Sequence, residues 1–110
     1  MKFTIKHYQQ IKKDDLFDLL AFRTKVFVVE QECPYQELDE LDKVCYHVYG
    51  KDNGIVVAVA RVVIDKEKPL ISIGRVAVHK GYRSSGVAKD MMNQILFFIK
   101  KNFNNMKIDQ

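Results

Sequence analysis

Residues 70–98, LISIGRVAVHKGYRSSGVAKDMMNQILFF, decide the fold of this chain. An apolar strand is predicted through Val78, and a short basic loop, Arg83 to Ala88, then opens an amphipathic helix. A loop of this kind directs several backbone N–H groups to one point, where the helix dipole also favours negative charge. Gly86 lets an anionic group approach the backbone without meeting a Cβ atom. The stretch therefore predicts a strand, loop and helix suited to binding a diphosphate.

Length and composition indicate one domain over residues 1–110, because 110 residues with 47% hydrophobic content can bury a single core. No apolar run approaches the roughly 18 residues that a membrane span needs, and even IVVAVA is followed at once by Arg61. The N-terminal residues lack the apolar region of a signal peptide, so we expect a cytoplasmic protein with no membrane partner. Cys33 and Cys45 lie outside any CxxC or His-rich pattern, which favours free thiols and no metal site.

The formal net charge of +4 raises nucleic-acid binding as a hypothesis. The lysines, however, are scattered over the termini and turns and form no continuous stripe accompanied by stacking aromatic residues. We therefore expect a solvated basic surface and no nucleic-acid partner.

Residues 1–69 are predicted to form a strand, one or two helices and then two further strands. A first strand is expected at residues 3–7, and Asp14 and Asp15 favour a helix start, from which apolar residues recur to Phe27 at spacings near three and four. An acidic connection interrupted by Pro34 follows, with room for a short second helix. Strand-like runs at residues 44–50 and 55–64 flank Asp52-Asn53-Gly54, the strongest turn signal of the chain.

The second half completes the sheet. Short connections between the runs ending at residues 64 and 79 indicate an antiparallel meander. A helix over residues 84–102 is expected next, and a strand at residues 106–108 returns through a right-handed crossover, parallel to its predecessor. The inward face of that helix is expected to comprise Ala88, Met91, Met92, Ile95, Ile99 and Phe103. The fold class is thus α+β, a three-layer arrangement of order β-α-(α)-β-β-β-α-β in which helices flank a mixed, mostly antiparallel sheet.

This element order and the loop resemble the GNAT superfamily of acetyl-CoA-dependent N-acetyltransferases. The superfamily signature is Arg or Gln, two residues, Gly, one residue, then Gly or Ala, and this chain has Arg83-Ser84-Ser85-Gly86-Val87-Ala88 after an apolar strand. Residues 22–31, FRTKVFVVEQ, together with Cys33-Pro34-Tyr35-Gln36-Glu37, Asp39 and Gly74-Arg75-Val76, resemble the ElaA-like branch of the superfamily. The resemblance covers essentially the whole chain.

The resemblance implies an N-acetyltransferase that uses acetyl-CoA as co-substrate. The acetyl group would pass to a primary amine of a small molecule or peptide by direct attack in a ternary complex. Backbone groups of Val76, Ala77 and Val78 would bind the pantetheine arm like an added strand. The pyrophosphate would lie on the N–H groups of the loop, where Arg83 would add a charge-assisted contact; the loop residues are Arg83, Ser84, Ser85, Gly86, Val87 and Ala88.

The catalytic groups are harder to place from the sequence. The backbone N–H near Val76 or Val78 is the implied oxyanion donor, but the strand at residues 72–75 carries no acid that could deprotonate the amine. The remaining candidates for the base are Glu30, Glu37, Asp39 and His47, with a water chain as the alternative. We expect Glu30 and Arg75 to be the catalytic pair: Arg75 would face the cleft and pair with Glu30 or with a substrate carboxylate. A structural ion pair is the other interpretation of Arg75.

The resemblance also implies a helix and a terminal strand pair beyond residues 106–108, which complete one wall of the acetyl-CoA cleft. In relatives this part often holds a Tyr that protonates the departing thiolate. The chain is therefore expected to be a fragment, to receive the wall from another chain, or to be a minimal form. A second hypothesis follows: a truncated, non-catalytic module that binds CoA or forms a homodimer through its exposed final strand.

Overall fold

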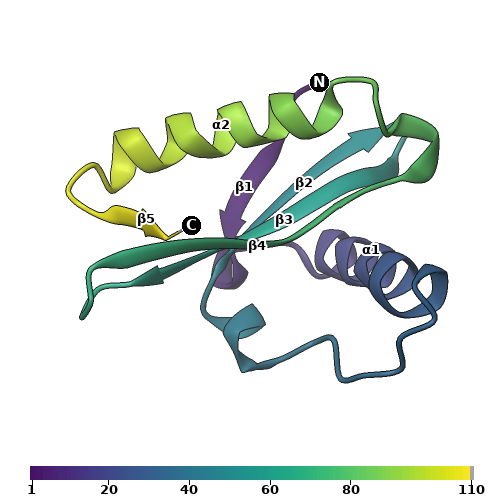
Figure 1. Ribbon diagram of the computed structural model, residues 1–110, viewed down its shortest axis with the longest axis horizontal. Coiled ribbons are helices and arrows are strands. Elements are labelled where there is room, and N and C mark those ends of the chain that lie inside the picture. The colour runs from purple at the N-terminus through teal and green to yellow at the C-terminus, as the bar shows by residue number, and fades with distance from the viewer. Residues whose placement is uncertain (110) are drawn as a thin grey trace.

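The structure is a computed structural model that describes residues 1–109. Figure 1 shows one five-stranded sheet in the order β1-β2-β3-β4-β5. The strands β1 to β4 pair antiparallel in sequence order, and β5 runs parallel to β4. The predicted mixed, mostly antiparallel sheet is therefore confirmed. The strands comprise Thr4–His7 (β1), Tyr46–Asp52 (β2), Ile55–Asp65 (β3), Leu70–Val78 (β4) and Lys107–Asp109 (β5).

Two helices cover opposite faces of the sheet and give the three expected layers (Figure 1). The first, α1, spans Lys13–Thr24 and continues as a π-helical segment, η2, over Lys25–Glu30. The second, α2, spans Val87–Asn102. Across residues 1–109, no helix is both long and apolar enough to cross a membrane. Short 3-10 helices fill the connections, at Tyr8–Gln10 (η1), Glu40–Lys43 (η3) and Lys80–Tyr82 (η4).

Each face of the sheet has its own hydrophobic cluster, because strand side chains alternate between the two faces. On the α2 face, Met91, Ile95 and Ile99 pack on Phe3, Val48, Ala58, Ala60, Val62 and Ile71. On the α1 face, the helix side chains Leu19 and Phe22, with Val26 of η2, pack on Tyr49, Val56, Val59 and Ala77. Cys33 is exposed and Cys45 is buried, and both are free thiols, as expected.

The start of α2 differs from the expected one. The helix begins at Val87 rather than near residue 84, because Ser84 and Gly86 have φ values of +66° and +85°, which no helix contains. Ala88 was expected in the core but is exposed: it lies in the first turn of α2, where it borders the hollow beside the loop. The expected burial of Ile95 is confirmed.

The burial of side chains on α2 predicts how much two of them, Ile95 and Phe97, contribute to the free energy of unfolding. Ile95 is fully buried, so Ile95→Ala should lower the free energy of unfolding by roughly 2–5 kcal/mol through lost transfer energy and the cavity that remains. Phe97 is 69% exposed, so Phe97→Ala should change it by less than about 1 kcal/mol. Urea unfolding of both variants measures the difference, and equal losses would contradict the described packing of α2.

Candidate functional site

The β5-side edge of β4 is open along most of its length. Strand β5 pairs only with Leu70, Ile71 and Ser72, so the edge from Ile73 onward has no strand partner within the described residues. The His79 N–H donates to the Val57 carbonyl of β3, whereas the Val78 carbonyl faces the open side. Because strand residues alternate, Val76 directs its backbone groups the same way as Val78. The main-chain groups of Val76 are thus directed to the open side, where an added strand could pair with them, whereas the Val78 carbonyl already accepts from Arg83 Nε.

A bulge interrupts β4 near the β5 end of this edge. Between the pairs Val59–Ala77 and Arg61–Gly74, β3 contains one residue whereas β4 contains two, Arg75 and Val76. Arg75 has a φ of +49°, in the left-handed region. A bulge adds twist and breaks the regular alternation of the ladder. The unpaired edge therefore has a distinct break at Arg75, close to its β5 end.

The loop before α2 forms the second part of the site. Among the described residues, none of the six N–H groups from Arg83 to Ala88 makes a short, well-aligned hydrogen bond to a carbonyl or a side chain. The loop borders a hollow of about 310 Å³ that is lined by Val78, Tyr82, Arg83, Ser84, Gly86, Ala88 and Lys89. Unpaired amides at a helix start, next to a hollow, form the arrangement in which proteins bind phosphate groups.

Hydrogen bonds from the neighbouring turn hold this loop in place. The Tyr82 hydroxyl donates to the Asp52 carboxylate at the end of β2, and this bond raises the Tyr82 pKa. The Ser85 hydroxyl donates to the Tyr82 carbonyl, and the Tyr82 N–H donates to the His79 carbonyl at 2.8 Å. The loop is therefore attached to the β2–β3 hairpin. No feature of the sequence indicated the partner of Tyr82, which lies 30 positions away.

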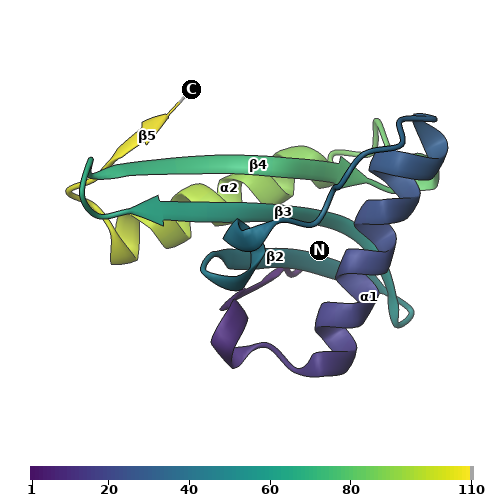
Figure 2. The same cartoon turned by 90° about the horizontal axis from the view of Figure 1, so that it is seen from below.

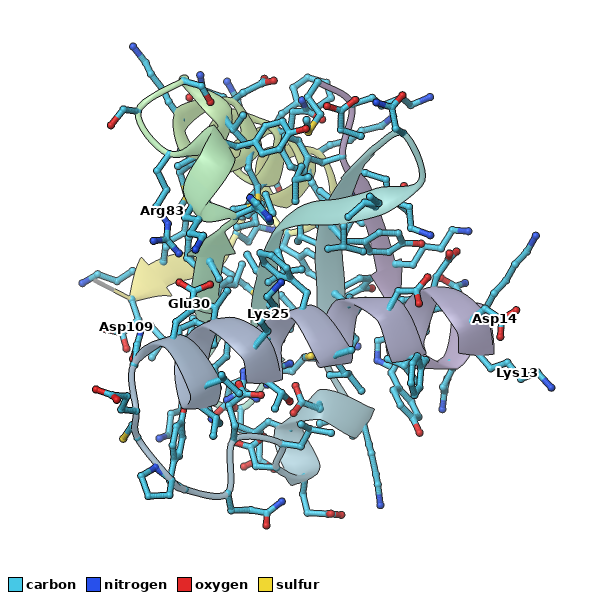
Figure 3. All side chains as sticks on the ribbon, turned by 90° about the vertical axis from the view of Figure 1, so that its right-hand side faces the viewer. Lys13, Asp14, Lys25, Glu30, Arg83 and Asp109 are labelled. Carbon is cyan, nitrogen blue, oxygen red and sulfur yellow. The ribbon has the colours of Figure 1, made fainter. Side chains whose placement is uncertain are left out.

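Arg83 lies beside the loop and makes two contacts within the chain. Its Nε donates to the Val78 carbonyl at 2.7 Å, and its Nη2 donates to Oε1 of Glu30 at 3.1 Å. Figure 3 shows Glu30 and Arg83 pointing toward each other from the end of η2 and from the loop. The expected pairing of Arg75 with Glu30 is therefore wrong, because Glu30 lies near the loop end of the open edge and pairs with Arg83.

Arg75 instead contacts the segment between η2 and β2. Its Nε donates to Oε2 of Glu37 at 2.8 Å and its Nη2 donates to the Glu37 carbonyl at 2.9 Å. Oδ2 of Asp39 lies 3.5 Å from the same guanidinium. The structural ion pair, which the sequence had left as the second interpretation of Arg75, is the arrangement observed.

These contacts belong to a larger network of three arginines and three carboxylates. Arg23 of α1 is 1% exposed and bonds both Glu37, at 2.7 Å, and Asp42, at 2.6 Å. Arg61 of β3 bonds Asp39 at 2.8 Å and Asp42 at 3.1 Å. Figure 2 shows the segment that carries these acids passing over the strands beside α1. The network therefore ties this segment to α1, β3 and β4 at once.

The charges of the network shift the Asp42 pKa. Burial alone would raise it, but hydrogen bonds from Arg23, Arg61 and the Asp39 N–H bring the pKa down to about 2. The sequence did not reveal this role of Arg23 or Asp42. A buried arginine in the stripe of an amphipathic helix, followed by an acid-rich segment, is the signal that could have indicated it.

Asp42 of the network also lies close to two other buried side chains, Cys45 and His47. One potential ligand atom of each lies within 4.8 Å of the others, a proximity that the sequence pattern did not reveal. The His47 ring donates through Nε2 to the Asp42 carbonyl at 2.8 Å, and burial raises the Cys45 pKa to about 12. Because the Asp42 carboxylate already accepts from two guanidinium groups, this group is better suited to packing than to holding a cation.

Comparisons with known proteins show the family of the chain. The model of the acetyltransferase (GNAT) family matches residues 13–108, and the chain belongs to that family. It is 36% identical over 108 residues to a UPF0039 protein of Schizosaccharomyces pombe, covering 97% of this chain and 71% of the relative. It is 37% identical over 93 residues to the protein ElaA of Escherichia coli, covering 82% of this chain but only 61% of that relative.

Solved structures extend the likeness to the fold. An acyl-CoA N-acyltransferase from Pseudomonas aeruginosa superposes with a TM-score of 0.90 at 31% identity, covering 98% of this chain and 75% of the other. Escherichia coli ElaA superposes with a TM-score of 0.91 at 30% identity, covering 97% and 74%. The resemblance to ElaA-like acetyltransferases and the GNAT fold are thereby confirmed, and the chain is an acyltransferase-family domain.

The low pKa of Asp42 predicts how stability depends on acid. Because the folded state lowers this pKa from 3.8 to about 2, the contribution is complete above pH 3.8 and is lost as the pH falls toward 2. The shift corresponds to about 2 kcal/mol. We expect the stability gap between wild type and Asp42→Asn to shrink by about that amount between about pH 5 and pH 2. Urea unfolding at several pH values measures it, and a constant gap would contradict the network.

Proposed function

We propose that this domain transfers the acetyl group of acetyl-CoA to a primary amine of a small molecule or peptide. The observation that carries the proposal is the row of unpaired loop amides from Arg83 to Ala88, which adjoins the open edge of β4. The loop would accept the diphosphate, with Arg83 as an additional cation, and the edge would accept the pantetheine arm as an added strand. Family membership supports acyl transfer in general.

The proposed reaction needs few groups from the protein. The amine nitrogen attacks the thioester carbonyl carbon, the C–S bond breaks, the amine loses one proton and the thiolate gains one. The Val76 N–H, within the bulge, would donate to the developing oxyanion. Holding both substrates beside the edge supplies much of the rate enhancement, since positioning alone lowers the barrier substantially.

The loop is tested with two matched glycine variants. Gly86 and Gly54 both have positive φ values and no heavy atom within 4 Å of an added Cβ, so substitution strains both similarly. Gly86→Glu adds bulk and negative charge to the diphosphate site, whereas Gly54→Glu lies in the β2–β3 turn. At acetyl-CoA about 100 times its Kd, wild type and Gly54→Glu should gain about 2.7 kcal/mol of stability and Gly86→Glu should gain none.

Differential scanning fluorimetry with and without acetyl-CoA reads out this comparison. An unchanged response of Gly86→Glu would remove the loop from the proposed site. A flat response of wild type would contradict the proposed function itself.

The catalytic role of Glu30 stays a prediction with its own kinetic test. If Glu30 takes the amine's proton, Glu30→Gln should lower kcat by about 10²-fold or more at saturating acetyl-CoA. Arg83→Gln is the control, because loss of a diphosphate contact should raise KM for acetyl-CoA far more than it lowers kcat. A Glu30→Gln enzyme that changes only that KM would assign the carboxylate to its contact with Arg83 instead.

Simple assays test two alternatives: a module that binds CoA without catalysis, and a homodimer. Release of CoA thiol in the presence of mixed amines distinguishes an enzyme from a module that only binds CoA. A homodimer through the final strand remains a proposal, supported by the position of β5 at the end of the described sheet. Sedimentation over a range of protein concentrations would detect it.

A further inference from the structure

Arg75 has a backbone conformation that its side chain disfavours. Its φ of +49° lies in the left-handed region, which a residue with a Cβ atom enters at a cost. In a bulge of this form the left-handed position usually belongs to glycine. The chain has a glycine one position earlier, at Gly74, yet the left-handed residue is the arginine. Some contact of the Arg75 side chain must offset the cost of its backbone.

The contact with Glu37 can offset it because Glu37 is fixed independently of β4. Its Oε2 atom accepts from Nε and Nη2 of Arg23, at 3.0 and 2.7 Å, and both side chains are at most 2% exposed. Arg75 bonds the same Oε2 atom and the Glu37 carbonyl, at 2.8 and 2.9 Å. Two donors of one guanidinium thus attach the bulge to a buried residue that α1 holds in place.

We propose that Arg75 is a positioning residue. Its hydrogen bonds to Glu37 keep its own backbone in the left-handed conformation, and this conformation of the β4 bulge directs the Val76 N–H toward the open edge. This inference rests on the proposed function for its catalytic meaning, since that N–H would face the thioester. It replaces the expectation that Arg75 contacts the substrate directly. The arginine acts through the backbone of its neighbour.

The link between the bulge and the edge is the alternation of a strand. An extra residue reverses which backbone groups face each side beyond it, so the orientation of Val76 and Val78 depends on the bulge. If Arg75 became extended and the ladder became regular, the edge groups of Val76 would turn toward β3. The Val76 N–H would then no longer face the same open side of the sheet as the N–H groups of the loop.

Two substitutions at the same position separate backbone geometry from charge. Arg75→Gly and Arg75→Ala both remove the guanidinium, and in both variants Glu37 retains Arg23 as its partner. Only glycine enters the left-handed region freely. We therefore expect Arg75→Gly to bind acetyl-CoA within about threefold of wild type and Arg75→Ala to bind about tenfold more weakly than Arg75→Gly.

Isothermal titration gives the two Kd values, and steady-state kinetics should show the same order in kcat/KM. Equal losses in the two variants would overturn the proposal, because they would assign the effect to the missing charge. Rescue by glycine is not expected of a merely stabilising ion pair, because both variants lose that pair equally.

Backbone NMR chemical shifts test the conformation of residue 75 directly, without a bound ligand. The Cα, Cβ and carbonyl shifts of residue 75 should report a left-handed conformation in wild type and in Arg75→Gly, and an extended one in Arg75→Ala. An extended residue 75 in wild type, or a left-handed one in Arg75→Ala, would overturn the proposal whether or not acetyl-CoA binds. A left-handed wild type that fails to bind acetyl-CoA would instead contradict the proposed function.

Discussion

The structure depends on one ion-pair network, in which Arg23, Arg61 and Arg75 are neutralised by Glu37, Asp39 and Asp42. Its centre is buried, whereas Arg75 and Asp39 lie at its exposed margin. Each guanidinium comes from a different element, namely α1, β3 and β4, and all three acids come from the segment between η2 and β2. Buried ion pairs add little net stability, because desolvation opposes their attraction, but they tolerate few alternative arrangements. Compared with apolar packing of the same volume, the network therefore contributes more to where this segment lies than to net stability, although removing one partner is costly.

As a consequence, the two faces of the sheet are stabilised by different interactions. On the α2 face, apolar side chains such as Met91, Ile95 and Ile71 form a dry core, where burial is the main source of stability. The α1 face combines apolar packing with the network, and it supports the bulge and the segment opposite it. The proposed function therefore relies on the face that is less apolar, where directed hydrogen bonds fix geometry that packing alone leaves free.

The sequence predicted the features that depend on neighbouring residues. Strand runs, the α2 stripe and the Gly86 loop each follow from local spacing, and all were placed within a few positions of where they lie. The partners of the charged residues could not be predicted in this way. Arg75 and Glu37 are 38 positions apart, and Arg83 and Glu30 are 53 apart, so which acid of the segment meets which arginine depends on how the segment folds. Arg75 pairs with Glu37, and not with the expected Glu30, for that reason.

The loop and the bulge together define the length of the proposed site. They lie at opposite ends of one unpaired edge, and at about 3.3 Å per residue the stretch from Arg75 to Val78 spans roughly 10 Å, to which the turn at residues 79–82 adds further distance. In the proposed complex, a pantetheine arm whose diphosphate lies at the loop would therefore present its far end near Val76. In the proposed reaction, a change at either end alone would misalign the reacting carbonyl. The left-handed Arg75 and the loop before α2 would therefore act as one unit, although no hydrogen bond within residues 1–109 joins them directly.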